Sequence, residues 1–165
     1  MPPDDQLVFM TRKRSWLISR SSKYSKPTLG VYMAMDDYLV EVFSKGIEMS
    51  IENRYQLNLI TNRNASYLTG NIELNGFKIF IINMTRLIFP DVKWFEDPMA
   101  HLERGLSVVT YLRDTYKMPI IVLCGWGKEK LTEETAIKRG ASYFFLIPVT
   151  YAKFIFAFKK CLENA

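Results

Sequence analysis

The sequence has few of the residues that metal sites and disulfide frameworks require. Its 165 residues include two cysteines, Cys124 and Cys161, and one histidine, His101. The cysteines have the spacing of neither a metal site nor a disulfide framework, which indicates reduced thiols in a reducing compartment. His101 has no neighbouring pattern of metal-ligating residues, and we expect it to be a solvated side chain at the start of a helix. We expect no cofactor.

Long apolar runs and a leader pattern are also missing. No stretch reaches the roughly 18 residues of a membrane span, because Lys153 interrupts the one candidate near the C-terminus. The chain begins Met-Pro-Pro-Asp-Asp, without the positive region and apolar run of a signal peptide. We therefore expect a cytoplasmic protein with no membrane contact.

The net charge of +5 belongs mainly to the N-terminal segment. Residues 1–28 contain six basic and two acidic side chains, a net +4, which leaves +1 for the rest of the chain. A basic segment of this kind is typically a solvated arm. We interpret residues 1–28 as a basic extension and residues 29–165 as one domain, since the chain is too short for two comfortable cores.

Short β-branched or aromatic runs alternate with segments of helical period along residues 29–165. The runs predict five buried strands, at 29–35, 57–60, 79–82, 120–123 and 143–147. The helical periods predict helices at 39–51, 65–72, 102–116, 129–139 and 151–162. Such alternation favours an α/β fold, in which helices cover both faces of a mostly parallel sheet in three layers, α-β-α.

Residues 84–104 do not follow this alternation. They lie between the third predicted strand and the third predicted helix, and they carry Phe89, Trp94 and Phe95 among prolines and aspartates. A loop of this length usually has a function or packing of its own. We treat it as an insertion in the domain.

Five segments occur in an order that is known from one family. They are LGVYMAMDD at 29–37, FKIFIIN at 77–83, GLSVVTYLR at 105–113, PIIVLCG at 119–125 and GASYFFLIPV at 140–149. In this order they resemble the receiver domain of bacterial response regulators. The resemblance implies a flavodoxin-like fold with five parallel strands.

The resemblance also identifies the positions of the family's phosphorylation site. It implies Asp36 and Asp37 as the acidic pair, Asn83 in place of the phosphoacceptor aspartate, Cys124 in place of a Ser/Thr, Ile147 in place of a lysine, and Phe144 as the switch-position aromatic. An amide is no nucleophile, so Asn83 cannot form an acyl phosphate. Ile147 cannot neutralise phosphate, and the Cys124 thiol is a weak hydrogen-bond donor. We therefore expect a pseudo-receiver, without phosphotransfer and not an enzyme.

The remaining residues of this degenerate site have two interpretations each. We expect Asp36 and Asp37 to cap the first helix, with residual metal binding as the alternative. We expect Cys124 to be an inert small hydrophobe, with redox sensing as the alternative. The insertion is expected to pack over or beside the site through its aromatic side chains.

The last predicted helix offers a candidate interaction surface. Its predicted buried stripe comprises Tyr151, Phe154, Ile155, Phe158 and Leu162. Phe156 then lies on another face beside Lys159 and Lys160, which is the composition of an interface anchor with a polar rim. Glu133 of the preceding helix would oppose these lysines in a homodimer.

Three functions follow from these observations. The leading one is a phosphorylation-independent signalling domain that binds a protein partner or a second copy through its C-terminal third. The second is binding of nucleic acid or an acidic surface by the basic arm with Trp16, which salt would weaken steeply. The third is a small-ligand binder or enzyme that uses Asp36, Asp37 and the insertion as a pocket. It ranks last because no general base, nucleophile and oxyanion donor occur together.

Overall fold

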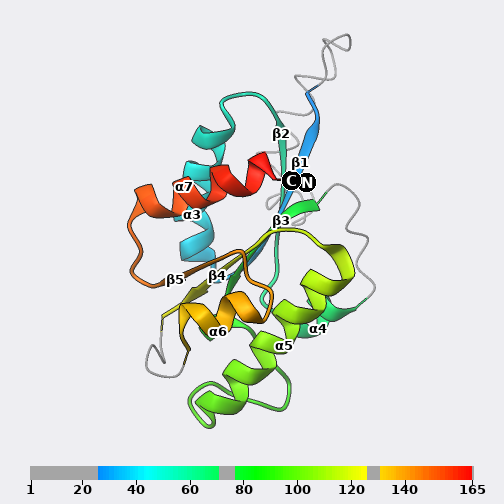
Figure 1. Cartoon of the computed structure of the whole chain (residues 1–165), viewed down its shortest axis with the longest axis vertical. Helices are drawn as coiled ribbons and strands as arrows, with labels where there is room; N and C mark the ends of the chain where they lie inside the picture. Colours follow the sequence, from blue (N-terminus) through cyan, green and yellow to red (C-terminus); the bar gives the residue numbers. More distant parts are fainter. Residues whose placement is uncertain (1–25, 71–76, 126–130, 165) are drawn as a thin grey trace, which may run out of the picture.

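The computed structural model describes residues 26–70, 77–125 and 131–164, so most of the predicted N-terminal arm lies outside the described residues. Strands and helices alternate along the chain (Figure 1). The strands are β1 (Thr28–Ala34), β2 (Gln56–Thr61), β3 (Phe77–Asn83), β4 (Ile120–Cys124) and β5 (Tyr143–Leu146). The helices are α3 (Asp37–Ile51), α4 (Ala65–Thr69), the 3-10 helix η2 (Met84–Arg86), α5 (Pro98–Tyr116), α6 (Glu133–Lys138) and α7 (Tyr151–Glu163).

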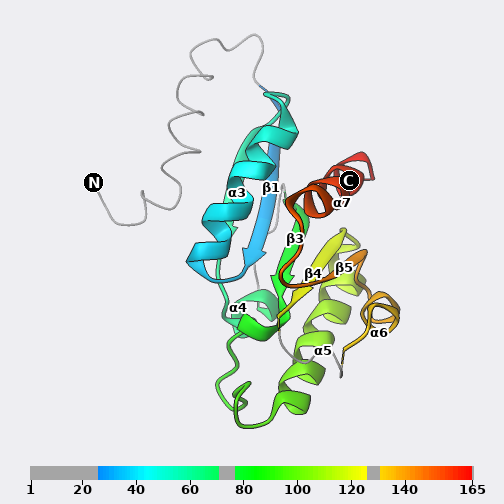
Figure 2. The ribbon, with the colours of Figure 1, turned by 90° about the vertical axis from the view of Figure 1, so that its left-hand side faces the viewer.

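All five strands form one parallel sheet in the order β2-β1-β3-β4-β5. Helices α3 and α7 cover one face of this sheet, and α4, α5 and α6 cover the other (Figures 1 and 2). The predicted three-layer, flavodoxin-like α/β fold is therefore confirmed. In such a fold, ligands and reacting groups meet at the carboxyl ends of the strands, where the strand order reverses.

The strands are buried on both faces, which explains why they appear in the sequence as nearly continuous apolar runs. Successive side chains point to opposite faces of a strand. Accordingly Ile81 packs with α3 and α7, whereas its neighbour Ile82 packs with α4, α5 and α6. The two cores therefore lie on opposite faces of the sheet.

The starts of α5 and α6 differ most from the sequence-based expectation. Helix α5 begins at Pro98, so residues 98–104 of the predicted insertion are helical. The Asp97 carboxylate caps this helix by accepting a hydrogen bond of 3.1 Å from the Ala100 amide, and proline is favourable in the first turn. Helix α6 begins at Glu133, while residues 129 and 130 of the predicted helix lie outside the described residues.

The buried face of α7 is also rotated from the predicted stripe. Phe154, Ala157, Phe158 and Cys161 are its buried residues, at the spacing i, i+3, i+4, i+7. Tyr151 is 44% exposed, because its ring lies across Gly46 at the edge of the contact between α7 and α3. Within the described residues, no helix has the length and apolarity that crossing a membrane requires.

Candidate functional site

The positions that the sequence resemblance assigns to a phosphorylation site lie at the carboxyl edge of the sheet, where β1, β3 and β4 end. Asn83 and Cys124 are the last residues of β3 and β4, and Asp36 follows the end of β1. The backbone amide of Ile147 donates a hydrogen bond of 3.0 Å to the Cys124 carbonyl, which places the segment after β5 at the same edge. The structure thus brings the five sequence-predicted positions to one end of the sheet.

The side chain of Asn83 forms a hydrogen bond with Thr85, a partner that the sequence did not indicate. The Asn83 side chain is buried, and its Oδ1 accepts a hydrogen bond of 2.8 Å from the hydroxyl of Thr85, which is also buried. The turn of η2 directly after β3 carries Thr85 back over the strand end. From the sequence, Thr85 was recognisable only as a hydroxyl-bearing residue two positions after the end of β3. In the structure its hydroxyl donates to the side-chain oxygen of Asn83.

Asp36 occupies the N-cap position of α3, but its carboxylate makes no capping hydrogen bond. The prediction that it caps the helix through its side chain is therefore wrong. Its Oδ2 lies 3.8 Å from Nε of Arg86, whereas its Oδ1 is buried and has no hydrogen-bond partner among the described residues. Because the Arg86 side chain is 52% exposed, this ion pair contributes only about 0–1 kcal/mol. Asp37 is exposed in the first turn, where a carboxylate favours the helix dipole.

These residues do not fit the divalent cation that a receiver site would hold. Magnesium and calcium take several oxygen ligands, among them carboxylates. Within the described residues no group of three or more His, Cys, Asp and Glu side chains comes together. The Asn83 oxygen already accepts from Thr85, and the Arg86 guanidinium brings a positive charge to Asp36. Among the described residues, the charged group that faces Asp36 is the guanidinium of Arg86.

The positions of the family's hydroxyl and lysine are apolar. Cys124 is fully buried in the core under α5 and forms no disulfide. Ile147 is half-buried and packs toward the core of α3 and α7. A Cβ on Gly125 would lie 3.6 Å from the Thr85 hydroxyl and 4.0 Å from Cβ of Ile147, so these three residues surround one point. Of the described side chains at that point, neither Thr85 nor Ile147 carries a positive charge.

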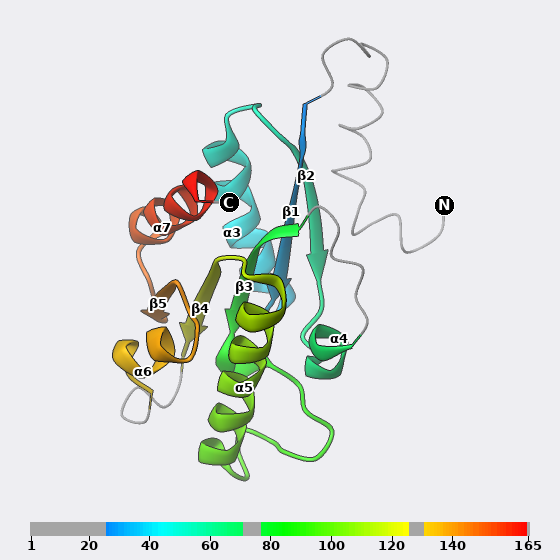
Figure 3. The ribbon, with the colours of Figure 1, turned by 45° about the vertical axis from the view of Figure 1, so that its right-hand side comes forward.

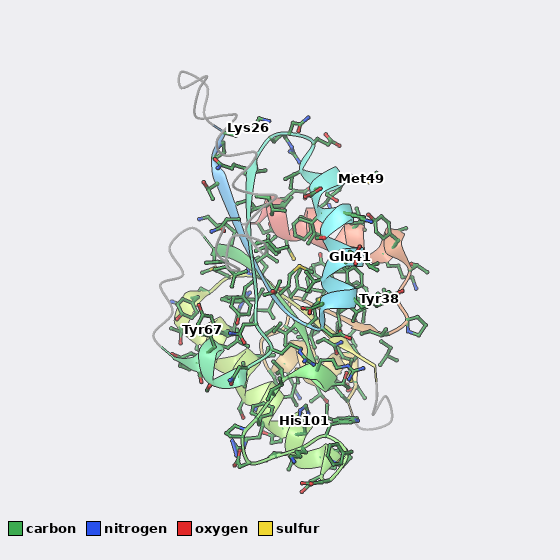
Figure 4. The ribbon with its side chains drawn as sticks, turned by 180° about the vertical axis from the view of Figure 1, so that it is seen from behind. Lys26, Tyr38, Glu41, Met49, Tyr67 and His101 are labelled. Atoms are coloured by element: carbon green, nitrogen blue, oxygen red, sulfur yellow. The ribbon has the colours of Figure 1, made fainter. Side chains whose placement is uncertain are left out.

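The insertion packs beside this site through Phe89 and Trp94, while Phe95 is exposed. With Thr85 and Arg86 they line one hollow of about 230 Å³. His101 lies behind them at the start of α5 (Figure 4). The expectation that His101 is solvated is wrong, because its side chain is 2% exposed. Its Nε2 lies 2.8 Å from the Leu87 carbonyl oxygen, and its ring makes edge contacts with Phe89 and Trp94 at 5.2 and 5.4 Å.

A second hollow, of about 570 Å³, lies between α6, β5 and α7. Phe144, Glu133 and Lys153 are among its lining residues. On α7, Phe156 is 61% exposed, and the Lys160 ammonium lies 5.7 Å from the centre of its ring. Lys160 also pairs with Glu163 of the same helix at 3.4 Å. Lys159 and Glu133 are exposed.

No protein-family model and no curated protein matches this sequence. Among solved structures, a response regulator receiver domain protein from Clostridium thermocellum is 16% identical with a TM-score of 0.56, covering 83% of this chain and 95% of its own. The receiver domain of NtrX from Brucella abortus is 19% identical with a TM-score of 0.55, covering 84% and 99%. The receiver domain of the Francisella response regulator 1452 is 16% identical with a TM-score of 0.56, covering 84% and 98%. The strand order, the helical layers and these likenesses together establish that the chain has the fold of a response regulator receiver domain.

Proposed function

We propose that this chain is a phosphorylation-independent signalling domain that acts by binding a protein partner or a second copy of itself. The observation that carries the proposal is the Asn83 amide, which stands where a receiver needs a nucleophilic carboxylate. An amide carries no charge and attacks no phosphoryl group. The receiver fold remains as a rigid platform, and we assign its activity to its surface, without enzymatic chemistry.

The neighbourhood of Asn83 supports this proposal. Thr85 binds the amide oxygen, Arg86 lies beside Asp36, and Ile147 offers only carbon where a lysine would hold the phosphate. A single substitution is therefore unable to restore the receiver chemistry, because three separate groups would have to return together.

The interaction surface that we propose lies over α6, β5 and α7. Lys153, Phe156 and Lys160 have the spacing i, i+3, i+7 and therefore share one face of α7. Lys153 also lines the hollow beside Phe144 and Glu133, so the exposed ring of Phe156 continues the same surface. A large aromatic ring bordered by charges is the composition of an interface anchor with a polar rim.

The phosphorylation part of the proposal is tested by intact-mass spectrometry after incubation with acetyl phosphate and magnesium. We expect the mass of the chain to stay unchanged. A phosphoryl adduct that maps to the peptide containing residues 77–86 would overturn the proposal.

The interaction part is tested by sedimentation of the full chain at increasing concentration, and by pull-down from its source cell. Phe156→Ser should weaken self-association or partner capture. Tyr38→Ser is the matched control, because it removes an exposed aromatic ring from α3, on a different part of the surface. A chain that stays monomeric and captures the same proteins with and without Phe156 would refute this surface.

A further inference from the structure

We propose that the hollow between η2, the insertion and the loop before α4 binds a small organic anion that carries a phosphate or carboxylate group and a flat ring. The hollow has a volume of about 230 Å³ and is lined by Thr85, Arg86 and His101 together with side chains from the two loops. This inference goes beyond the proposed interaction function. It also stands independently, because the hollow shares no lining residue with the surface over α6, β5 and α7.

The charge of the lining favours an anion. Arg63, Arg86 and Lys93 line the hollow, and among its described lining residues none is acidic. Arg86 approaches Asp36 at 3.8 Å, but Arg63 has no ion pair within the described part of the chain. Of the carboxylates on the insertion, Asp91 pairs with Arg104, Asp97 caps α5 and Glu103 pairs with Arg139. Glu96 is exposed and, like these three, is not among the residues that line the hollow. Cations gathered without carboxylates suit a phosphate or carboxylate ligand.

His101 provides the second, independent observation. The Leu87 carbonyl can only accept a hydrogen bond, so Nε2 of His101 carries the hydrogen in their contact of 2.8 Å. Nδ1 of the same ring is buried and has no partner among the described residues. A buried polar atom without a partner costs about 1–3 kcal/mol. Since His101 lines the hollow, a hydroxyl of the ligand's anionic group, as on a singly protonated phosphate, would supply the hydrogen-bond donor that Nδ1 lacks.

The aromatic side chains of the lining specify a ring on the ligand. Trp94 and Phe89 flank His101, and the Lys93 ammonium lies 5.9 Å from the centre of the Phe95 ring. Planar groups stack on or meet such rings edge to face. Because the hollow is smaller than the roughly 300–1,000 Å³ typical of drug-sized ligands, the ligand is limited to about one ring with its anionic group.

The hollow is held in shape by backbone contacts between its two loops. The Ile88 amide donates to the Arg63 carbonyl at 2.8 Å, and the Ala65 amide donates to the Ile88 carbonyl at 3.0 Å. These bonds form a parallel bridge between Asn64 and Ile88, so the insertion is tied to the start of α4 (Figure 3). A site whose walls are fixed before binding loses little entropy on binding.

The test follows the fluorescence of Trp94, which lines the hollow and should respond when a ligand binds there. Replacing Trp16 and Trp126 by Phe leaves Trp94 as the only one of the chain's three tryptophans. Phenyl phosphate, benzoate, phenol and methyl phosphate are titrated separately into this full chain at low salt, up to about 10 mM. We expect saturable changes with phenyl phosphate or benzoate, and none with phenol. The stronger of the two anions identifies the ligand as a phosphate or a carboxylate.

The double variant R63Q/K93Q should bind the preferred anion about tenfold more weakly, because it removes one half-buried and one exposed cation from the lining of the hollow. Lys138→Gln, which removes an exposed lysine from α6, is the matched control and should bind like the parent chain. The absence of any saturable change with both ring-bearing anions would overturn the proposal. An affinity of R63Q/K93Q equal to that of the parent chain would also overturn it. If methyl phosphate bound as tightly as phenyl phosphate, the part of the proposal that assigns a flat ring to the ligand would be wrong.

Discussion

At the scale of single residues, the site at the carboxyl edge of the sheet is defined by the contacts that its side chains make. Asn83 accepts from Thr85, and Arg86 stands beside Asp36. Asn83 was evident from sequence because it ends an apolar strand. Thr85 and Arg86 were not, because their orientation depends on the 3-10 turn of η2, which no pattern in the sequence marked.

Gly140 is required by backbone geometry. Its φ is +119°, and a Cβ at this position would lie 2.8 Å from Cβ of Arg113 on α5. We expect Gly140→Ala to lower the free energy of unfolding by about 1–3 kcal/mol, measured by urea denaturation. Gly125→Ala is the control, because the nearest atom to its Cβ is 3.6 Å away, and its effect should stay within about 0.5 kcal/mol. Equal losses in the two variants would show that the constraint at Gly140 is absent.

Burial of Cys161 makes the stability of the fold depend on alkaline pH. The side chain is 1% exposed, and burial raises the pKa of its thiol from 9.0 to about 12, against a smaller lowering effect of Arg113. Since the unfolded chain loses this proton first, the free energy of unfolding is unaffected below about pH 9 and falls between about pH 9 and about pH 12.

The measurement is urea denaturation of the wild type and Cys161→Ala between about pH 7 and about pH 11. The variant should lose less stability over this range than the wild type does. Part of the slope should remain, because burial also raises the pKa of Tyr32. Identical slopes in both proteins would contradict the assigned cause.

At the scale of elements, α7 carries aromatic residues of two kinds, buried ones that belong to the core and exposed ones on the surface. Phe158 is fully buried and stacks near Phe154, whereas Phe156 is exposed on another face. Phe158→Ala should cost about 3–5 kcal/mol, because a buried ring leaves a cavity. Phe156→Ala should change stability by less than about 0.5 kcal/mol. Thermal or urea unfolding of both variants decides the assignment, and severe destabilisation by Phe156→Ala would place that ring in the core and remove it from the interaction surface.

The insertion was the element for which sequence was least informative. Its aromatic residues were noticed, but the burial of His101 was not, because a polar side chain in the first turn of a helix is usually solvated. His101 is buried because the loop bridges to Asn64 and then brings Phe89 and Trp94 against the start of α5. Such contacts between distant segments leave no periodic signal in the sequence.

At the scale of the whole molecule, the fold was predictable because the five strands are buried on both faces. Runs such as those of β3 and β4 alternate with helical segments, and this alternation allows few topologies. The face of α7 was less predictable, since Tyr151 has the right spacing for the core but lies across Gly46 instead. Helical periodicity predicts an apolar face of the helix, but the elements that pack against the helix determine which residues at the edge of that face are buried.

The central claim is that this receiver fold works without a phosphorylated state. The most direct measurement is an NMR titration of the full chain with beryllofluoride and magnesium, which together imitate the phosphorylated site. We expect no saturable shift in the amide signals of Asp36, Asn83, Thr85 and Gly125, and none in Asn83→Asp, because Cys124 and Ile147 still lack the hydroxyl and the lysine. Saturable shifts of the wild type confined to these four amides would contradict the account.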